Sequence, residues 1–197
     1  MKKKKNLIVV IILIIILSLI ILFGKNFIMR QYFIYKIENV DYDEYILTTS
    51  LNGKKTNISY YSDDIHIFRK YDKNGNLNNV MKIYDYDKNI SYEYNITNKT
   101  YIKNKSNFCE IENMNNFNLL SLLKNEEEKK KFIYKGIEQI NNRECYILLF
   151  EKDKEDYKII YLDKELLYTI REEDNYLTLD YDLDFNLQEK YLFEFEL

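Results

Sequence analysis

The sequence predicts a mainly β protein, in which an N-terminal transmembrane helix precedes an open antiparallel β-barrel or half-barrel with one or two short helices. Three observations carry this prediction. Four lysines and an apolar run open the chain, later segments alternate with a period of two, and Asn-Gly pairs separate several of those segments. We therefore divide the chain into a signal anchor over residues 1–24, a helical linker over 25–41 and a β domain over 42–197.

The apolar run extends over residues 7–23 and is interrupted only by Ser18. As a helix it would measure about 26 Å, which is near the lower limit for a bilayer core of about 30 Å. A cleaved signal peptide is the alternative, but its apolar region usually has only about 7 to 15 residues and ends in small residues. Leu22-Phe23-Gly24 is a poor match to such a cleavage site.

The four lysines should remain in the cytoplasm by the positive-inside tendency. We therefore expect a single-pass protein of the cytoplasmic membrane, held by residues 7–23, with its N terminus inside and its C-terminal domain extracytoplasmic. The linker should continue as a helix before the β domain begins. Its apolar residues are spaced loosely as one helical face, formed by Phe27, Ile28, Tyr32, Tyr35 and Ile37.

From Tyr45 onward the pattern changes to that of strands. Asn52-Gly53 and Asn74-Gly75 supply the positive φ angles of tight hairpin turns, and Asn141-Asn142 is a further two-residue turn. About twelve strands are expected, at 45–51, 56–61, 65–71, after Gly75, 90–96, near Tyr101, 132–140, 144–151, 157–162, 166–171, 176–185 and 190–197. Residues 144–151 are apolar on both faces, as in a doubly covered strand, and residues 117–124 carry the leucine stripe of a short helix.

The charge of the chain argues against nucleic-acid binding. Without the four N-terminal lysines, 25 basic residues stand against 32 acidic ones, a formal charge of −7. Binding by counterion release needs clustered basic residues, and the cluster at 129–131 directly follows three glutamates. We expect no nucleic-acid partner.

His66 is the only histidine, and it alternates with Ile65 and Ile67 in a predicted strand. One histidine cannot build a His-rich metal site, and the G-x-S-x-G nucleophile motif is missing from the sequence. We therefore expect His66 at a surface or half-buried strand position, and we assign no catalytic residue and no cofactor.

Three alternating aspartates near the C terminus, Asp180, Asp182 and Asp184, resemble the opening of a calcium loop. The glycine and glutamate that such a loop needs at its sixth and twelfth positions are Phe185 and Tyr191 here. The aspartates are therefore expected on the wet face of a strand, and no metal site is predicted.

The two cysteines, Cys109 and Cys145, would lie in a compartment that permits oxidation. A disulfide between them would close a loop of about 37 residues and would stabilise the fold by about 4 kcal/mol in the chain-entropy model. A pair of buried free thiols is the equal alternative.

A resemblance to a known family rests on two motifs. Residues 135–150, KGIEQINNRECYILLF, followed by YLDKE at 161–165, are similar to a strand pair and turn of the LolA-like lipoprotein-carrier superfamily. The helix, the hairpin at Asn52-Gly53, and the IYD and YEYN segments at 83–85 and 92–95 follow the plan of its first half. The chain departs from the family pattern where Asn142 replaces a glycine and where Leu166-Leu167 replace a Thr-Gly-Leu-Pro turn.

The resemblance implies a LolA-like fold over residues 30–197 and suggests a Gram-positive, membrane-anchored member, similar to sporulation and germination lipoproteins such as GerS. It also implies a non-enzymatic binding protein for a lipid or hydrophobic ligand, or for an envelope or cell-wall partner protein. From the converging faces of a predicted strand and helix, we expect an apolar cleft lined by Tyr92, Tyr94, Leu120 and Leu123, with an ordinary closed core as the alternative.

A cell-envelope hydrolase is the alternative function. It would use acidic pairs such as Asp63-Asp64, or Asp85 with Asp87. Such chemistry requires a carboxylic acid of raised pKa that faces a cleft. Nothing in the sequence indicates one.

Overall fold

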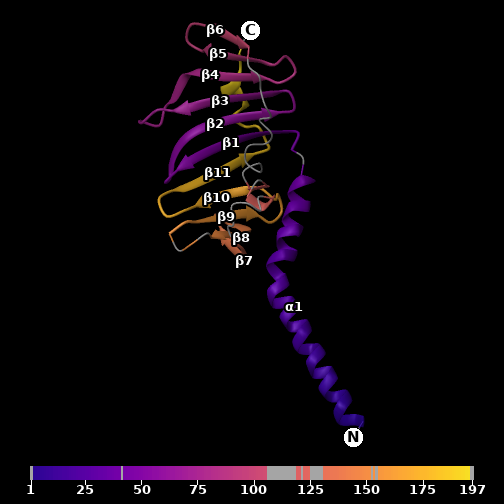
Figure 1. Ribbon diagram of the computed structural model, residues 1–197. Helices are drawn as coiled ribbons and strands as arrows, with labels where there is room; N and C mark the ends of the chain where they lie inside the picture. Colours follow the sequence, from indigo (N-terminus) through magenta and orange to yellow (C-terminus); the bar gives the residue numbers. More distant parts are fainter. Residues whose placement is uncertain are drawn as a thin grey trace.

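The fold is an open antiparallel sheet to which one long helix is attached (Figure 1). The computed structural model describes residues 2–40, 42–105, 119–120, 122–124, 131–151, 153 and 155–195. The described elements are α1 (Lys2–Glu38), β1 (Glu44–Leu51), β2 (Lys54–Ser62), β3 (Ile65–Tyr71), β4 (Leu77–Asp85), β5 (Ile90–Asn95), β6 (Thr100–Lys105), β7 (Lys131–Ile140), β8 (Arg143–Glu151), β9 (Tyr157–Asp163), β10 (Thr169–Glu173), β11 (Thr178–Asp184) and the 3-10 helix η1 (Lys190–Phe193). The predicted mainly β fold is confirmed.

The sheet consists of two meanders that meet at its centre. Its eleven described strands follow the order β6-β5-β4-β3-β2-β1-β11-β10-β9-β8-β7, so strands that are consecutive in sequence pair within each meander, and β1 pairs with β11 where the meanders meet. The first and the last described strands, β1 and β11, therefore lie side by side at the centre of the open sheet, and β6 and β7 form its two edges.

Two hairpin turns have the backbone that the sequence predicts. Asn52 and Gly53 have φ angles of 49° and 77°, and Asn141 and Asn142 have φ angles of 51° and 63°. Asparagine tolerates this left-handed region better than other residues with a side chain, apart from aspartate. The departure at Asn142 from the expected glycine therefore preserves the turn.

The two aspartates of the family-like motifs stabilise turns. Asp163 Oδ1 accepts hydrogen bonds from the backbone N–H groups of Glu165 and Leu166, at 2.8 and 2.9 Å. Asp85 Oδ1 accepts one from Lys88 N at 3.0 Å, and its Oδ2 pairs with Lys88 Nζ at 2.7 Å. These contacts give both aspartates a structural role, because side-chain acceptors satisfy the backbone donors of tight turns.

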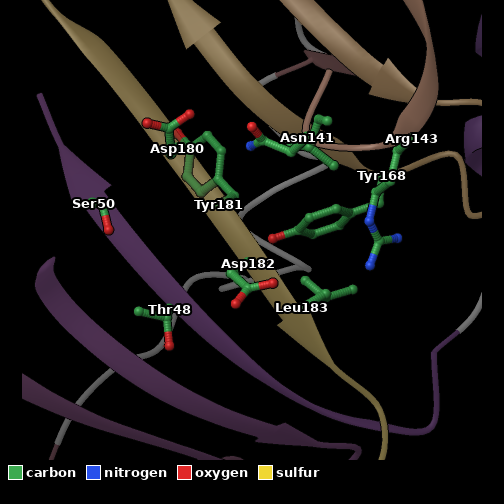
Figure 2. A pocket seen from close by; sticks show the side chains of 10 residues that line it. Thr48, Ser50, Asn141, Arg143, Tyr168, Asp180, Tyr181, Asp182 and Leu183 are labelled. Carbon is green, nitrogen blue, oxygen red and sulfur yellow. The ribbon is translucent and has the colours of Figure 1, made fainter. Parts of the chain in front are cut away.

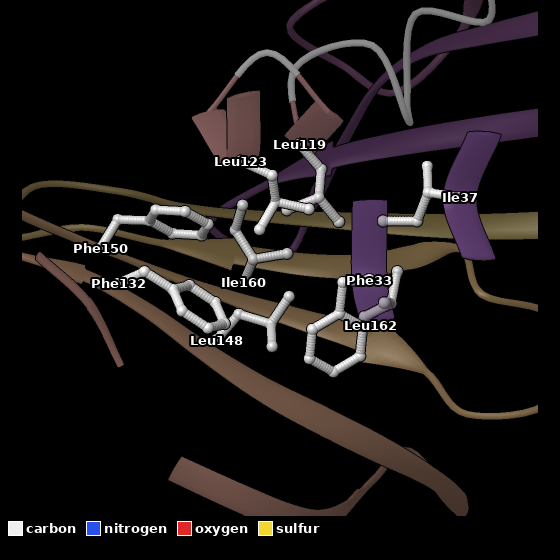
Figure 3. Packing of buried hydrophobic residues seen from close by; sticks show 9 residues of the cluster. All are labelled: Phe33, Ile37, Leu119, Leu123, Phe132, Leu148, Phe150, Ile160 and Leu162. Atoms are coloured by element: carbon white, nitrogen blue, oxygen red, sulfur yellow. The ribbon is translucent and has the colours of Figure 1, made fainter. Parts of the chain in front are cut away.

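The C-terminal half of α1 packs on the β7–β9 part of the sheet (Figure 3). Phe33 is fully buried, and its ring centroid lies 5.1 Å from that of Tyr146. Arg30 Nε also donates to the backbone oxygen of Leu123 at 2.6 Å, which joins α1 to the helical residues at 119–120 and 122–124. The buried members of this core are Phe33, Ile37, Leu119, Leu123, Phe132, Leu148, Phe150, Ile160 and Leu162.

The face of α1 that meets the sheet differs from the predicted face. Met29, Phe33 and Ile37 lie at positions i, i+4 and i+8 and contact the core, whereas Phe27 and Tyr35 are each 66% exposed. The loose grouping in the prediction joined residues from both sides of the helix, although only a spacing of three or four residues keeps side chains on one face.

A second core lies under the C-terminal segment. Phe193 of η1 is buried against β1–β5, and Arg69 donates to the backbone oxygens of Leu192 at 2.8 Å and Asn78 at 2.9 Å. The strand predicted at 190–197 is therefore wrong for the described residues 190–195. Because β1 and β10 already pair with both sides of β11, no central strand position remains open to this segment.

No helical stretch among the residues described with their side chains is both long enough and apolar enough to cross a bilayer.

Candidate functional site

A cavity of about 440 Å³ lies where the two meanders of the sheet meet (Figure 2). The pairing of β1 with β11 places Thr48 opposite Asp182 and Ser50 opposite Asp180. Directly opposed residues in an antiparallel pair project from the same face, so the four polar side chains gather along one side of the junction. The remaining lining residues are Asn141, Arg143, Tyr168, Ile170, Tyr181 and Leu183.

The turn between β7 and β8 supplies the opposite wall. The left-handed backbone at Asn141 and Asn142 reverses the chain within two residues, so that Asn141 and Arg143 both line the cavity. Arg143 Nη1 pairs with Asp163 Oδ2 at 3.1 Å, and that carboxylate is almost fully buried. The positive charge of Arg143 is therefore balanced beside the cavity.

One carboxylate in the cavity is not paired. Asp180 Oδ1 accepts a charge-assisted hydrogen bond from Arg171 Nε at 2.6 Å, and Arg171 also pairs with Glu173 at 3.5 Å. Asp182 is exposed to solvent and forms no hydrogen bond or ion pair with any residue that the structure describes, and the side-chain hydroxyls of Thr48 and Ser50 likewise have no described partner. The cavity thus presents one carboxylate without a described partner, together with two hydroxyl groups.

Tyr168 forms a buried wall of the same cavity. Figure 2 shows its ring directed toward β11, with the hydroxyl beside Tyr181 and Asp182. Only 2% of Tyr168 is exposed, and among the described residues its hydroxyl has no hydrogen-bond partner. Burial, followed by the nearby Tyr45, raises the pKa of Tyr168 well above its ordinary value. The hydroxyl therefore keeps its proton at neutral pH, and a buried hydroxyl without a partner is costly in free energy.

His66 belongs to a ladder of stacked rings beyond this wall. Its imidazole lies 4.2 Å from the Tyr61 ring and 5.5 Å from the Tyr84 ring, nearly parallel to both. His66 is 2% exposed, so the predicted surface or half-buried position is wrong. Direct cross-strand pairing of β2, β3 and β4 brings the three rings together, and burial lowers the pKa of His66 to about 4.

The structure does not bring the four predicted cleft residues together. Tyr92 and Tyr94 are buried in the core that contains Phe193, whereas Leu120 and Leu123 pack in the core that contains Phe33. The prediction assumed that the 117–124 helix covers β5. The described helical residues 119–120 and 122–124 instead pack with α1 on the other half of the sheet.

The acidic pairs of the alternative hydrolase do not line a cleft. Asp85 is buried and caps the turn after β4, while Asp87 is exposed in the same turn. Asp63 and Asp64 are exposed at the corner between β2 and β3. None of the four lines a described cavity.

The alternating aspartates lie on β11, and one of the two cysteines, Cys145, is among the described residues. The described residues contain no group of three or more His, Cys, Asp or Glu side chains that could hold a metal ion, and Asp180, Asp182 and Asp184 alternate along β11 as the wet-face interpretation expects. Cys145 is buried and forms no disulfide with any cysteine that the structure describes. Cys109 lies outside the described residues, so the disulfide remains a prediction.

Two other hollows differ in character from the β1–β11 cavity. One of about 620 Å³ lies between hairpin tips and is lined by Lys54, Lys55 and Lys73, which are all exposed. The other, of about 280 Å³, lies beside Phe193 under the C-terminal segment. Neither contains a buried polar group without a partner among the described residues. We therefore take the β1–β11 cavity as the candidate site.

Sequence reasoning missed most residues of this cavity. Thr48 and Asp182 are more than 130 positions apart, and only the β1–β11 pairing juxtaposes them. The alternating aspartates at 180–184 were a visible signal. Their polar partners on β1 could not be assigned without the strand order.

No protein-family model and no curated protein matches this chain. Three solved structures with which it shares a likeness are an uncharacterized conserved protein from Thermus thermophilus, an outer membrane lipoprotein-sorting protein domain from Vibrio parahaemolyticus, and the MucA/MucB complex of Pseudomonas aeruginosa. The sequence identities are 8%, 14% and 10%, and the TM-scores are 0.45, 0.30 and 0.31. The alignments cover 85%, 86% and 72% of this chain and 93%, 98% and 51% of the respective solved chains.

Proposed function

We propose that this protein is a non-catalytic binding protein, tethered to the outer side of the cytoplasmic membrane, which holds a positively charged group of its partner in the β1–β11 cavity. The unpaired Asp182 carboxylate carries this proposal, because it lies beside two hydroxyls without described partners and a buried phenol. Convergent polar groups that have no internal partner are typical of a ligand site.

The first part of α1 supports the tether. The eight consecutive aliphatic residues at 10–17 are each about half exposed, although no polar face balances them. Water solvates such a surface poorly, and a helix that is apolar all round is typically buried in protein or lipid. The four lysines that precede it favour a cytoplasmic N terminus.

The chemistry of the cavity favours a primary alkylammonium group. Such a group has three donors and no acceptor, which suits the acceptor oxygens of Asp182, Thr48 and Ser50. Ile170 and Leu183 border the same cavity and would contact an alkyl stem. A lysine side chain of an envelope protein and a small amine both have this chemistry.

The experiment uses the full chain in nanodiscs and three four-carbon probes: n-butylammonium, n-butanol and butyrate. Ligand-observed NMR should detect n-butylammonium preferentially. Asp182→Asn should weaken its binding about tenfold, as expected for the loss of one charge-assisted contact. The matched control, Asp64→Asn, removes an exposed carboxylate at the β2–β3 corner and should leave binding unchanged. Equal binding of butanol, or an unaffected Asp182→Asn variant, would contradict the proposal.

A further inference from the structure

The long helix and the edge strand β7 are joined where the apolar run ends. α1 is continuous from Lys2 to Glu38, and its apolar run ends at Phe23 in the sequence. Two residues later, Lys25 Nζ lies 5.1 Å from the centroid of the Tyr134 ring. The next residue, Asn26, accepts a hydrogen bond from Tyr134 N at 3.0 Å through Oδ1.

These two contacts place β7 at the level of the helix where a membrane segment would end. Each helical residue advances the chain by about 1.5 Å, so Lys25 and Asn26 lie within about 5 Å of the end of the apolar run along the axis. Figure 1 shows β7 at the end of the sheet toward the N terminus and β6 at the opposite end. The joint therefore sets which edge of the sheet is nearest to a bilayer that contains residues 7–23.

The side chains near the joint suit a lipid headgroup region. Phe27 and Ile28 of α1 are 66% and 60% exposed, and Ile137 of β7 is 45% exposed. Lys131 and Lys135 are exposed on the same strand, which also exposes one carboxylate, that of Glu138. Aromatic and aliphatic residues favour the boundary of the hydrocarbon, while lysines are attracted to phosphate groups.

We infer that the outer edge of β7, with Lys131, Lys135 and Ile137, rests on the phospholipid headgroups, so that the sheet stands on the membrane with β6 farthest away. This inference rests on the proposed membrane tether. The bilayer would then cover an edge strand that no described strand pairs, which prevents edge-to-edge association.

The orientation has a consequence for the binding site. Strands in a sheet are spaced by about 4.8 Å, and β11 is four strands away from β7. The β1–β11 cavity would be held roughly 20 Å from the headgroups. A partner that reaches it would be an envelope protein near the membrane surface.

The test places one fluorophore at Ile137→Cys on β7, or at the matched control Ile102→Cys on β6, which is 64% exposed. Both variants carry Cys109→Ser, and the full chain is reconstituted in phosphatidylcholine nanodiscs with a lipid spin-labelled at the headgroup. Quenching of the Ile137→Cys label should exceed that of the Ile102→Cys label several-fold. Adding phosphatidylglycerol should increase the quenching of the Ile137→Cys label. The double substitution Lys131→Glu with Lys135→Glu should make this increase smaller.

Two outcomes separate the inference from the tether. A chain that enters the nanodiscs but shows equal quenching at both labels overturns the β7 orientation and leaves the tether intact. A chain that does not enter the nanodiscs overturns both. Lys54→Glu with Lys55→Glu, on exposed lysines of β2, is the charge control and should leave quenching unchanged.

Discussion

The neutral, buried His66 should make the stability of the fold depend on pH in a way that one substitution removes. The imidazole is stacked between Tyr61 and Tyr84, and neither ring nitrogen has a hydrogen-bond partner among the described residues. His66→Phe retains a flat ring of similar size but cannot bind a proton. The difference between the two chains therefore isolates the titration of His66.

The magnitude follows from the two pKa values of the imidazole. In the unfolded chain His66 should have an ordinary pKa of about 6.5, whereas burial lowers its pKa to about 4 in the fold. Unfolding therefore takes up a proton between these values, so stability is full above pH 6.5 and falls as the pH decreases toward 4. The loss is about 2 kcal/mol at about pH 5 and about 3 kcal/mol below pH 4.

Urea denaturation of the full chain in mild detergent, at about pH 7.5 and about pH 5, measures this effect. The native chain should lose about 2 kcal/mol more than His66→Phe between the two conditions. Carboxylates titrate in both chains, so their contribution cancels in the comparison. An equal loss in both chains would show that the folded imidazole titrates normally and would refute the argument from burial.

Three further substitutions test packing and backbone. Phe33→Ala should destabilise the fold by about 3–5 kcal/mol, because it leaves a cavity between α1 and the sheet. Tyr35→Ala, at an exposed position of the same helix, should change the stability by less than about 0.5 kcal/mol in the same denaturation assay. Arg69→Lys should lower the free energy of unfolding by about 2 kcal/mol and expose the C-terminal segment to proteolysis, because a lysine ammonium cannot reach the carbonyl oxygens of both Leu192 and Asn78. Unchanged proteolysis would contradict this role of Arg69. Asn142→Val should lower the free energy of unfolding by about 1–2 kcal/mol at its φ of 63°, while Asn142→Gly should not, and equal stabilities would argue against a left-handed turn.

Local patterns predicted most of the sheet. Strands β3 and β5 begin at the predicted residues, and the turns at Asn52-Gly53 and Asn141-Asn142 have the expected positive φ angles. Period-two alternation and turn chemistry act over a few residues, so sequence alone can reveal them. Leu167 has a φ of 54°, in the left-handed region that favours glycine, and it stands where the LolA-like motif has glycine.

Long-range packing set the features that sequence reasoning missed. The burial of His66 depends on rings from β2 and β4, and the candidate site depends on β1 meeting β11. The segment at 190–195 has strand-like alternation, yet every central position in the sheet was already filled. The face of α1 that packs on the sheet could have been predicted from the sequence, because Met29, Phe33 and Ile37 recur every four residues.

The central claim is that the β1–β11 cavity binds a partner in the envelope. Its most direct test is photo-crosslinking from a benzophenone amino acid at Ser50, which lines the cavity, in the full chain within native membranes. The account predicts a discrete adduct that disappears in the Asp182→Asn variant and is competed by n-butylammonium. The same crosslinker at the exposed Asp64 should give no such adduct. A Ser50 adduct that survives both Asp182→Asn and the competitor, or the same adduct from Asp64, would contradict the account.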